Sequence, residues 1–321
     1  MNGRLEKYIA ISGGVGGAKL CLGLAQILTA DEIAFVVNTG DDFEHFGLHI
    51  SPDLDTLMYT LAGLSNPDTG WGRQNESWNF IAALKALGGE TWFNLGDADL
   101  ATHVMRTQLL AAGNNLTEVT ATLSRRMGIE HAVLPMSNDP VRTIVHTHNG
   151  DLPFQHYFVR ERCEPSVRGF EFVGSASARL PVEIQQWLTD PALAGVIICP
   201  SNPYVSIDPI LSLPEFADWL SATEVPVVAV SPIVGGEAIK GPTAKMMREL
   251  SVSASAAAIA ERYRDIIDGF VIDQRDATLT SRVAALGIET IVAQTIMVTL
   301  SDRIDLARTV IDFLGSVKRG K

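Results

Sequence analysis

The chain of 321 residues has only three cysteines, no long apolar run and fewer basic than acidic residues. The cysteines are odd in number, widely spaced and set beside apolar neighbours, which excludes a disulfide framework and a cysteine-rich metal cluster. We therefore expect Cys21, Cys163 and Cys199 to be buried free thiols. No run approaches the roughly 20 apolar residues of a membrane span, and charges and glycines near the N-terminus do not fit a signal peptide. These absences predict a cytoplasmic protein that does not enter a membrane.

The charge balance narrows the choice of partners. With 25 Lys and Arg against 37 Asp and Glu, the formal net charge is −12, which repels nucleic acid and anionic membranes. The chain is nevertheless 46% hydrophobic and long enough to bury a large core as one α/β domain, with or without an insert. An acidic protein that binds phosphate does so locally, through backbone amides, a few cations and a divalent ion held by carboxylates.

A glycine-rich turn is the first feature that points to such a ligand. Residues 8–11 predict a strand, residues 12–19 read SGGVGGAK, and an amphipathic helix follows to near Ala30. Glycines let the backbone approach a ligand, and the N–H groups of the following helix end attract phosphate. The spacing matches neither the P-loop nor the dinucleotide fingerprint, so a tight turn without a ligand is the alternative.

Two pairs of aspartates come next. Asp41 and Asp42 follow a predicted buried strand over residues 33–37, where they fit a ribose hydroxyl, a Mg²⁺ ion or a helix N-cap. Asp53 and Asp55 lie in the segment SPDLDT over residues 51–56, at the start of a predicted helix. One of this second pair is expected to cap that helix, which leaves the other for a different role.

A third acidic cluster and a histidine pair complete this half of the chain. The segment NLGDADLATH over residues 94–103 follows a short apolar stretch at 91–93, which we expect to be the end of a strand. His45 and His49 have the spacing of two zinc ligands on a helix, but Gly47 between them disfavours that helix. Hydrogen-bonding histidines are the favoured interpretation, and a zinc hydrolase site is the alternative.

The second half predicts two more strands with polar ends. Residues 195–199 and 225–230 read as buried parallel strands, followed by PSNP at 200–203 and SPIVGG at 231–236. Residues 240–245 place lysines beside glycine and proline before a helix through Met246 and Leu250. These loops suit a phosphate or a nucleobase, and ordinary strand-to-helix loops are the alternative.

The remaining patterns describe a scaffold. Helices are expected over residues 257–267 and 304–314, with a strand at 269–272. Alternating segments at 142–147 and 154–159 flank Asn149, Gly150 and Asp151, a hairpin signal. We therefore predict a core over 1–130 and 175–321, which contains the glycine loop and the acidic segments, and an antiparallel insert over 131–174.

Taken together, these motifs resemble the 2-phospho-L-lactate transferases of coenzyme F-420 biosynthesis, with LPMS at 134–137 a further match. The resemblance covers nearly the whole chain. It implies a Rossmann-like three-layer α/β/α fold with a mostly parallel sheet and a small antiparallel insert, in a homodimer that uses Mg²⁺. The implied reaction moves a phosphorylated three-carbon acid from its guanosine diphosphate conjugate to the ribityl hydroxyl of the deazaflavin Fo, releasing GMP. The acid would be 2-phospholactate, phosphoenolpyruvate or 3-phosphoglycerate.

The resemblance also implies roles for residues. Asp55, Asn94 and Asp97 would bind Fo, although relatives can have a basic side chain at the position of Asn94. Asp41 and Asp42 would bind Mg²⁺, and Asp55 and Asp41 are the catalytic candidates. The residues implied for the nucleotide and phosphates are Ser12, Gly13, Gly14, Gly16, Gly17, Lys19, Ser201, Asn202, Ser231, Gly235, Gly236, Lys240 and Gly241.

Two other functions fit parts of the same pattern. A related group with a similar glycine loop resembles a nucleotide-sugar-binding regulatory protein, which would keep the nucleotide loops without the Fo contacts. Asp55 together with LGD at 95–97 favours the transferase over this sensor. An NAD-linked dehydrogenase would use the acid after the second strand, but the missing third glycine of the fingerprint disfavours it.

Overall fold

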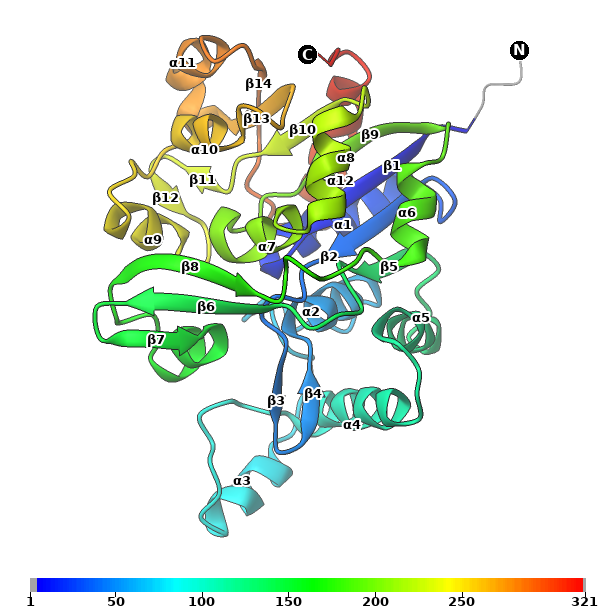
Figure 1. Ribbon diagram of the computed structural model, residues 1–321, viewed down its shortest axis with the longest axis vertical. Coiled ribbons are helices and arrows are strands. Elements are labelled where there is room, and N and C mark those ends of the chain that lie inside the picture. Colours follow the sequence, from blue (N-terminus) through cyan, green and yellow to red (C-terminus); the bar gives the residue numbers. More distant parts are fainter. Residues whose placement is uncertain (1–4, 320–321) are drawn as a thin grey trace.

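A seven-stranded parallel sheet forms the centre of the computed structural model, which describes residues 5–319 (Figure 1). Its strand order is β14–β13–β10–β9–β1–β2–β5. The strands are β1 (Lys7–Ser12), β2 (Ile33–Val37), β5 (Ala132–Pro135), β9 (Leu193–Ile198), β10 (Val227–Val230), β13 (Gly269–Asp273) and β14 (Glu289–Ala293). The chain builds outward from β1 to β5, returns to the other side of β1 at β9, and then continues to β14. The sheet therefore has a topological switch point between β1 and β9, as in a Rossmann-like fold.

Continuous apolar runs become the central strands because helices cover both faces of the sheet. Along β1 the side chains alternate between two cores, with Ile9 and Ile11 on one side and Tyr8 and Ala10 on the other. The first core contains helices α6 (Val182–Leu188), α7 (Asp208–Leu211), α8 (Pro214–Ala222), α9 (Thr243–Glu249), α10 (Ala256–Tyr263) and α11 (Thr280–Ala284). The second contains α1 (Gly14–Ile27), α2 (Pro52–Leu61), α5 (Leu116–Arg126) and α12 (Leu300–Leu314). The three-layer α/β/α prediction is confirmed.

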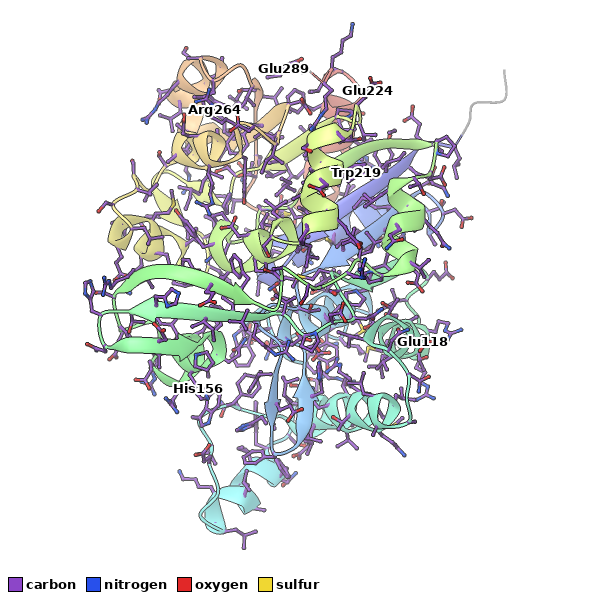
Figure 2. The ribbon with its side chains drawn as sticks, viewed as in Figure 1. Glu118, His156, Trp219, Glu224, Arg264 and Glu289 are labelled. Atoms are coloured by element: carbon purple, nitrogen blue, oxygen red, sulfur yellow. The ribbon has the colours of Figure 1, made fainter. Side chains whose placement is uncertain are left out.

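Smaller elements surround this core. Antiparallel pairs are β3 (Phe43–His45) with β4 (Leu48–Ile50) and β11 (Ile233–Val234) with β12 (Glu237–Ala238). Short helical turns are η1 (His156–Arg160), η2 (Pro203–Ile207) and η3 (Gln274–Leu279). Helix α4 (Asp97–Ala111) lies beside the β3–β4 hairpin, and α3 (Asn79–Ala86) lies beyond it, farthest from the sheet (Figure 1). Exposed charged side chains such as Glu118, Glu224 and Arg264 lie around the outer rim (Figure 2).

The predicted second strand of the hairpin, over residues 154–159, is wrong. The antiparallel sheet consists of β7 (Gly150–Pro153), β6 (Arg142–Thr147) and β8 (Val167–Val173), and residues 154–159 turn into η1 instead of forming a strand. Phe154 and Phe158 then lie on one side of this turn, stacked with ring centroids 5.3 Å apart. β5 belongs to the main sheet, although its residues lie in the range 131–174 that we assigned to the insert.

The structure tests what we predicted for the three cysteines and for membrane spans. Cys21 and Cys199 are buried with their Sγ atoms 3.8 Å apart, whereas Cys163 is only partly buried; all three are free thiols. Within residues 5–319, no helix has the length and apolar character that crossing a bilayer requires.

Candidate active site

A cavity of about 620 Å³ opens at the carboxyl ends of the central strands, at the switch point between β1 and β9. Open α/β sheets bind their ligands at this position. Its walls come from the glycine loop, the first turns of α2, the loops after β9 and β10, and the segments before α9 and α12. Of the residues singled out from the sequence, those that line it are Gly13, Gly14, Gly16, Lys19, Asp41, Asp53, Asp55, Asn94, Ser201, Asn202, Ser231, Lys240 and Gly241.

Other sequence candidates lie behind or beside this wall: Ser12, Gly17, Asp42, Asp97, Gly235 and Gly236. A Cβ atom on Gly17 would meet the Ser12 Oγ at 2.2 Å and the Ser201 Oγ at 2.5 Å, so this glycine lets α1 pack tightly against both serines. Gly235 donates its backbone N–H to Asp276 Oδ2 at 2.9 Å. These contacts give the glycines packing and turn-forming roles in the structure.

The glycine loop is closed by polar partners from other segments. Gly14, the first residue of α1, has a φ of +63°, a conformation that favours glycine. Its N–H donates to Asp53 Oδ1 at 2.7 Å, and the N–H of Gly13 donates to the Ser201 Oγ at 3.2 Å. We expected either Asp53 or Asp55 to cap α2. Asp53 does not cap that helix, because its carboxylate binds the N-terminus of α1.

Asp41 and Asp53 share a buried position at the cavity wall. The side-chain amide of Asn38 donates to Asp53 Oδ2 at 2.9 Å and also to Asp41 Oδ1. Burial, and then the charges of Asp53 and Asp42, raise the pKa of Asp41 well above its usual range. Burial also raises the pKa of Asp53 to about 6, against hydrogen bonds from Asn38 and Gly14 that lower it.

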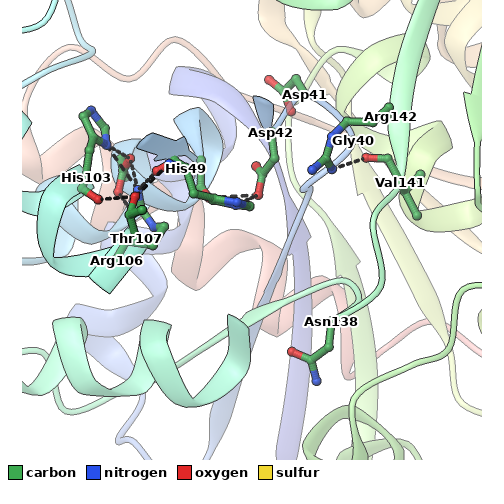
Figure 3. Close-up of polar contacts among 12 residues, drawn as sticks. Gly40, Asp41, Asp42, His49, His103, Arg106, Thr107, Asn138, Val141 and Arg142 are labelled. Atoms are coloured by element: carbon green, nitrogen blue, oxygen red, sulfur yellow. Dashed lines mark hydrogen bonds and ion pairs between the residues drawn. The ribbon is translucent and has the colours of Figure 1, made fainter. Parts of the chain in front are cut away.

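Asp42 turns away from Asp41, toward the β3–β4 hairpin (Figure 3). Its Oδ2 accepts a hydrogen bond from the Ser51 hydroxyl at 2.8 Å and lies 3.1 Å from His49 Nε2. Its Oδ1 is buried and has no hydrogen-bond partner. His49 and His45 point to opposite faces of the hairpin because His49 pairs with Glu44, the neighbour of His45. The two histidines therefore do not form the zinc site considered from the sequence.

Asp41 and Asp53 are candidate ligands for a divalent cation, and both line the cavity. Across residues 5–319, no lysine or arginine lies within ion-pair distance of Asp41, Asp42 or Asp53. Buried carboxylates normally have a cationic partner or a metal ion, because an isolated buried charge is costly. Hard oxygen ligands of this kind suit Mg²⁺. Asp42 does not line the cavity, and the three carboxylates are not gathered within 4.8 Å of one another as the ligand atoms of Asp55, Asp99 and His103 are.

A second group of ionisable side chains combines Asp55, two residues after Asp53 on α2, with Asp99 and His103 of α4. Asp55, Asp99 and His103 each offer a ligand atom within 4.8 Å of the others, so this triad could also hold a metal ion. Here, however, a cationic group is present. Arg106 Nη2 donates to Asp55 Oδ1, and Arg106 Nη1 donates to Asp55 Oδ2 at 3.1 Å. Burial raises the pKa of Asp55, and the charge of Arg106 opposes that rise.

Asn94 and Asp97 separate at the edge of the cavity. Asn94 lines it, whereas the Asp97 carboxylate accepts from the Ser77 hydroxyl at 2.6 Å and from the Phe80 N–H at 2.9 Å. These hydrogen bonds lower the pKa of Asp97 to about 2 and attach it to the start of α3. The expected strand at 91–93 is wrong, because this segment is irregular and its Trp92 packs against His45.

Two lysines supply positive charge elsewhere on the cavity wall. Lys19 Nζ donates to the carbonyl of Met297 at 2.9 Å, and Lys240 Nζ donates to the carbonyl of Thr69 at 2.8 Å. Burial, and then the charges of Arg303 and Lys240, lower the pKa of Lys19. Neither lysine forms an ion pair with the acids of residues 5–319, so both charges are available to an anionic ligand.

Sequence reasoning missed the apolar part of the site. Aromatic side chains on the wall are Tyr59, Trp71, Phe93, Phe154 and Phe158. They come from a helix, irregular loops and η1, with no shared spacing. Only Phe154 and Phe158 have a helical spacing that the sequence could have revealed. Trp71 and Phe158 are exposed and Tyr59 and Phe154 are buried, and aromatic side chains beside a cavity suit a flat ring system.

Comparison with known proteins identifies the family and supports the fold. A family model described as 2-phospho-L-lactate transferase CofD matches residues 9–300. The chain is 37% identical over 322 residues to a phosphoenolpyruvate transferase of Kitasatospora aureofaciens, covering 98% of this chain and 99% of that one. It is also 37% identical over 303 residues to a 2-phospho-L-lactate transferase of Methanosarcina mazei, covering 94% and 99% respectively.

A solved structure of a UPF0052 family protein from Bacillus halodurans superimposes with a TM-score of 0.62, covering 96% of this chain and 100% of that one. At 12% identity this likeness supports the fold alone. The family model and the two transferases instead match at the level of sequence, over nearly the full length. This protein belongs to the 2-phospho-L-lactate transferase CofD family.

Proposed function

We propose that this protein transfers a phosphorylated three-carbon acid from its guanosine diphosphate conjugate to the ribityl hydroxyl of Fo, releasing GMP. The observation that carries the proposal is one cavity lined by Asp41 and Asp53, which have no lysine or arginine partner among residues 5–319, by Lys19 and Lys240, which have no acidic partner there, and by an aromatic wall. A diphosphate ester needs a metal and cations, whereas a deazaflavin needs a flat apolar surface. The names of the related transferases support the same reaction class.

On the donor side, we propose that the glycine loop, Ser201, Asn202 and the segment from Ser231 to Gly241 hold the guanosine conjugate. Lys19 and Lys240 attract its phosphates and neutralise charge that develops on the leaving GMP. Asp41, Asp42 and Asp53 would hold Mg²⁺, which when bound screens the diphosphate oxygens and makes phosphorus more electrophilic. No covalent enzyme intermediate is needed, because the acceptor alcohol attacks the bound diphosphate directly.

On the acceptor side, we propose that the Fo ring lies against the aromatic wall and that its ribityl chain reaches Asp55. Asp55 then orients the attacking hydroxyl or accepts its proton. Asn94 contributes a neutral amide at the edge of the same region. In this geometry Asp97 contributes indirectly, because its carboxylate is engaged by Ser77 and the start of α3.

The chemistry of the cavity leaves three donors to compare. 2-phospholactate, phosphoenolpyruvate and 3-phosphoglycerate each present a carboxylate and a phosphate, and the related proteins are named for two of these acids. The experiment is mass spectrometry of the full-length protein incubated with Fo, Mg²⁺ and each guanosine conjugate in turn. A phosphodiester-linked deazaflavin together with GMP is the expected product, and the productive conjugate identifies the acid.

The same experiment separates the enzyme from a nucleotide-sugar-binding regulatory protein. Tight nucleotide binding without product from any conjugate would support the regulatory function and overturn the transferase. We also propose a homodimer that works in the cytoplasm. Sedimentation velocity tests the first part, because the dimer would have twice the 34.6 kDa mass of the chain, and fractionation of cells tests the second.

A further inference from the structure

Helix α4 buries a polar face. Its buried residues are Thr102, His103 and Arg106, whereas a helix at a protein surface normally buries apolar side chains. Asp99, His103 and Arg106 recur at intervals of four and three residues, which places them on one side of the helix. That side faces α2, where Tyr59 donates its hydroxyl to Asp99 Oδ1 at 2.6 Å. The most buried side of α4 therefore forms a polar network, whereas Met105, Leu109 and Leu110 of the same helix pack against the second core.

Arg106 is the centre of this network (Figure 3). Arg106 is fully buried, and its guanidinium donates hydrogen bonds to both carboxylate oxygens of Asp55. Replacing a buried ion pair by apolar residues of similar volume is often neutral or stabilising, so stability alone does not explain such a pair. For a carboxylate on a cavity wall, the orientation of its oxygens also matters, because it decides which ligand atoms they can bind.

His103 fixes the guanidinium from the other side. Arg106 Nη1 lies 3.2 Å from His103 Nδ1, and because arginine only donates, Nδ1 must accept. The ring proton is therefore on Nε2, which lies 3.2 Å from Asp99 Oδ2. The His103 Nδ1 lone pair is already engaged by Arg106, so a divalent ion bound through His103 Nδ1 would have to displace that contact.

We propose that Arg106 and His103 are positioning residues that hold the Asp55 carboxylate in one orientation toward the acceptor alcohol. This inference rests on the proposed function, because it assigns the network to Fo and not to the nucleotide. It also assigns the divalent cation to the side of Asp41 and Asp53, and not to Asp55, Asp99 and His103, although the ligand atoms of that triad lie within 4.8 Å of one another.

The test is steady-state kinetics with Fo and the productive conjugate varied separately. Arg106→Lys keeps the charge but loses the two-pronged grip, and we expect kcat/KM for Fo to fall about 10- to 100-fold. The KM for the conjugate should stay within about twofold. In an Asp55→Asn background the same substitution should add less than about twofold, because the two residues act as one unit.

A matched control is Arg319→Lys. Arg319 also forms a buried ion pair, with Nη1 3.0 Å from Asp268 Oδ2, and neither residue lines the cavity. This variant is expected to lower the melting temperature while both kinetic parameters stay within about twofold of wild type. If Arg106→Lys does not fold, His103→Leu replaces it, with an expected loss of about 3- to 10-fold in kcat/KM for Fo.

Several results would overturn the positioning role while the proposed function stands. One such result is an active wild-type protein together with an unchanged kcat/KM for Fo in both Arg106→Lys and His103→Leu. A second is an equal loss of kcat/KM for Fo and for the conjugate. A third is a loss in Arg106→Lys that adds fully to the loss in Asp55→Asn. Binding of Mn²⁺ that disappears in His103→Leu but survives in Asp41→Asn would reverse the metal assignment. A wild-type protein that neither binds Fo nor forms product overturns the proposed function and this inference together.

Discussion

Asp53 and Asp55 are two residues apart on the same helix turn, yet their surroundings are opposite. Asp53 lies beside Asp41 and accepts only neutral N–H donors, from Asn38 and Gly14. Asp55 is held by the guanidinium of Arg106 and has His103 close by. Both are buried, so their partners distinguish them. Asp53 can still bind a cation, whereas Asp55 is already paired with the cationic side chain of Arg106.

This contrast shows how one short motif can serve two substrates. A helix with residues at i and i+2 directs those side chains to different sides, so the Asp53 side meets the N-terminus of α1 and the Asp55 side meets α4. We assign the first side to Mg²⁺ and the donor diphosphate, and the second to the acceptor. The transfer would then occur between the two aspartates.

The largest expected effect is on Asp41, the carboxylate with no cationic partner. Asp41→Asn should lower turnover about 100- to 1,000-fold, because metal and diphosphate charge would be poorly held. Mg²⁺ titrations of activity measure this, with Asp151→Asn on β7 as a control at an exposed aspartate. In the presence of EDTA the Asp41 variant should be at least as stable as wild type, since burial disfavours the charged form. Retained Mg²⁺ activation in Asp41→Asn would remove the contrast between the two carboxylates.

The next effect concerns pH and Asp53. Its folded pKa of about 6 lies above the ordinary 3.8, so the stability from this group is full below pH 4 and is lost as pH rises through 6. In EDTA, Asp53→Asn should therefore gain stability over wild type at pH 7, on the order of 2 kcal/mol, and the difference should vanish near pH 4. Denaturant unfolding at both pH values measures it. A variant less stable than wild type at pH 7 would contradict the assignment of Asp53 as an unpaired carboxylate.

A smaller effect is expected at Lys240, on the donor side. Lys240→Ala should raise the KM for the guanosine conjugate about 10-fold and leave the KM for Fo unchanged, because one charge-assisted contact to phosphate is lost. Lys85→Ala on α3 is the control, since Lys85 is exposed and does not line the cavity. If only the KM for Fo increased, Lys240 would belong to the acceptor side of the cavity and not to the donor side.

The smallest effect is expected at Asp97. Its carboxylate binds Ser77 and the first residues of α3, so Asp97→Asn should keep kcat/KM for Fo within about twofold of wild type. The measurement is the Fo titration used for Arg106→Lys. A loss as large as that of Asp55→Asn would show that Asp97 touches the acceptor directly.

Local patterns predicted most of the fold. The apolar runs that became β1, β2, β9 and β13 are continuous and flanked by glycine, proline or polar residues, so length and composition identify them as buried strands. The same logic failed at 91–93 and 154–159, where short apolar runs are irregular or helical. Such runs fill the cavity wall and the edge of the insert, and their shape depends on what they pack against.

For the site, the sequence by itself determined which chemistry is present: a glycine loop, clustered carboxylates and lysines at strand ends. Parallel strands end on the same edge of a sheet, so these segments had to converge. Only the tertiary structure decided which carboxylate faces which partner. Arg106 reaches Asp55 across 51 positions of the chain, and Asp53 binds a backbone N–H 39 positions away. Hydrogen bonds and buried charges depend on distance in space, and no local spacing in the sequence encodes that distance.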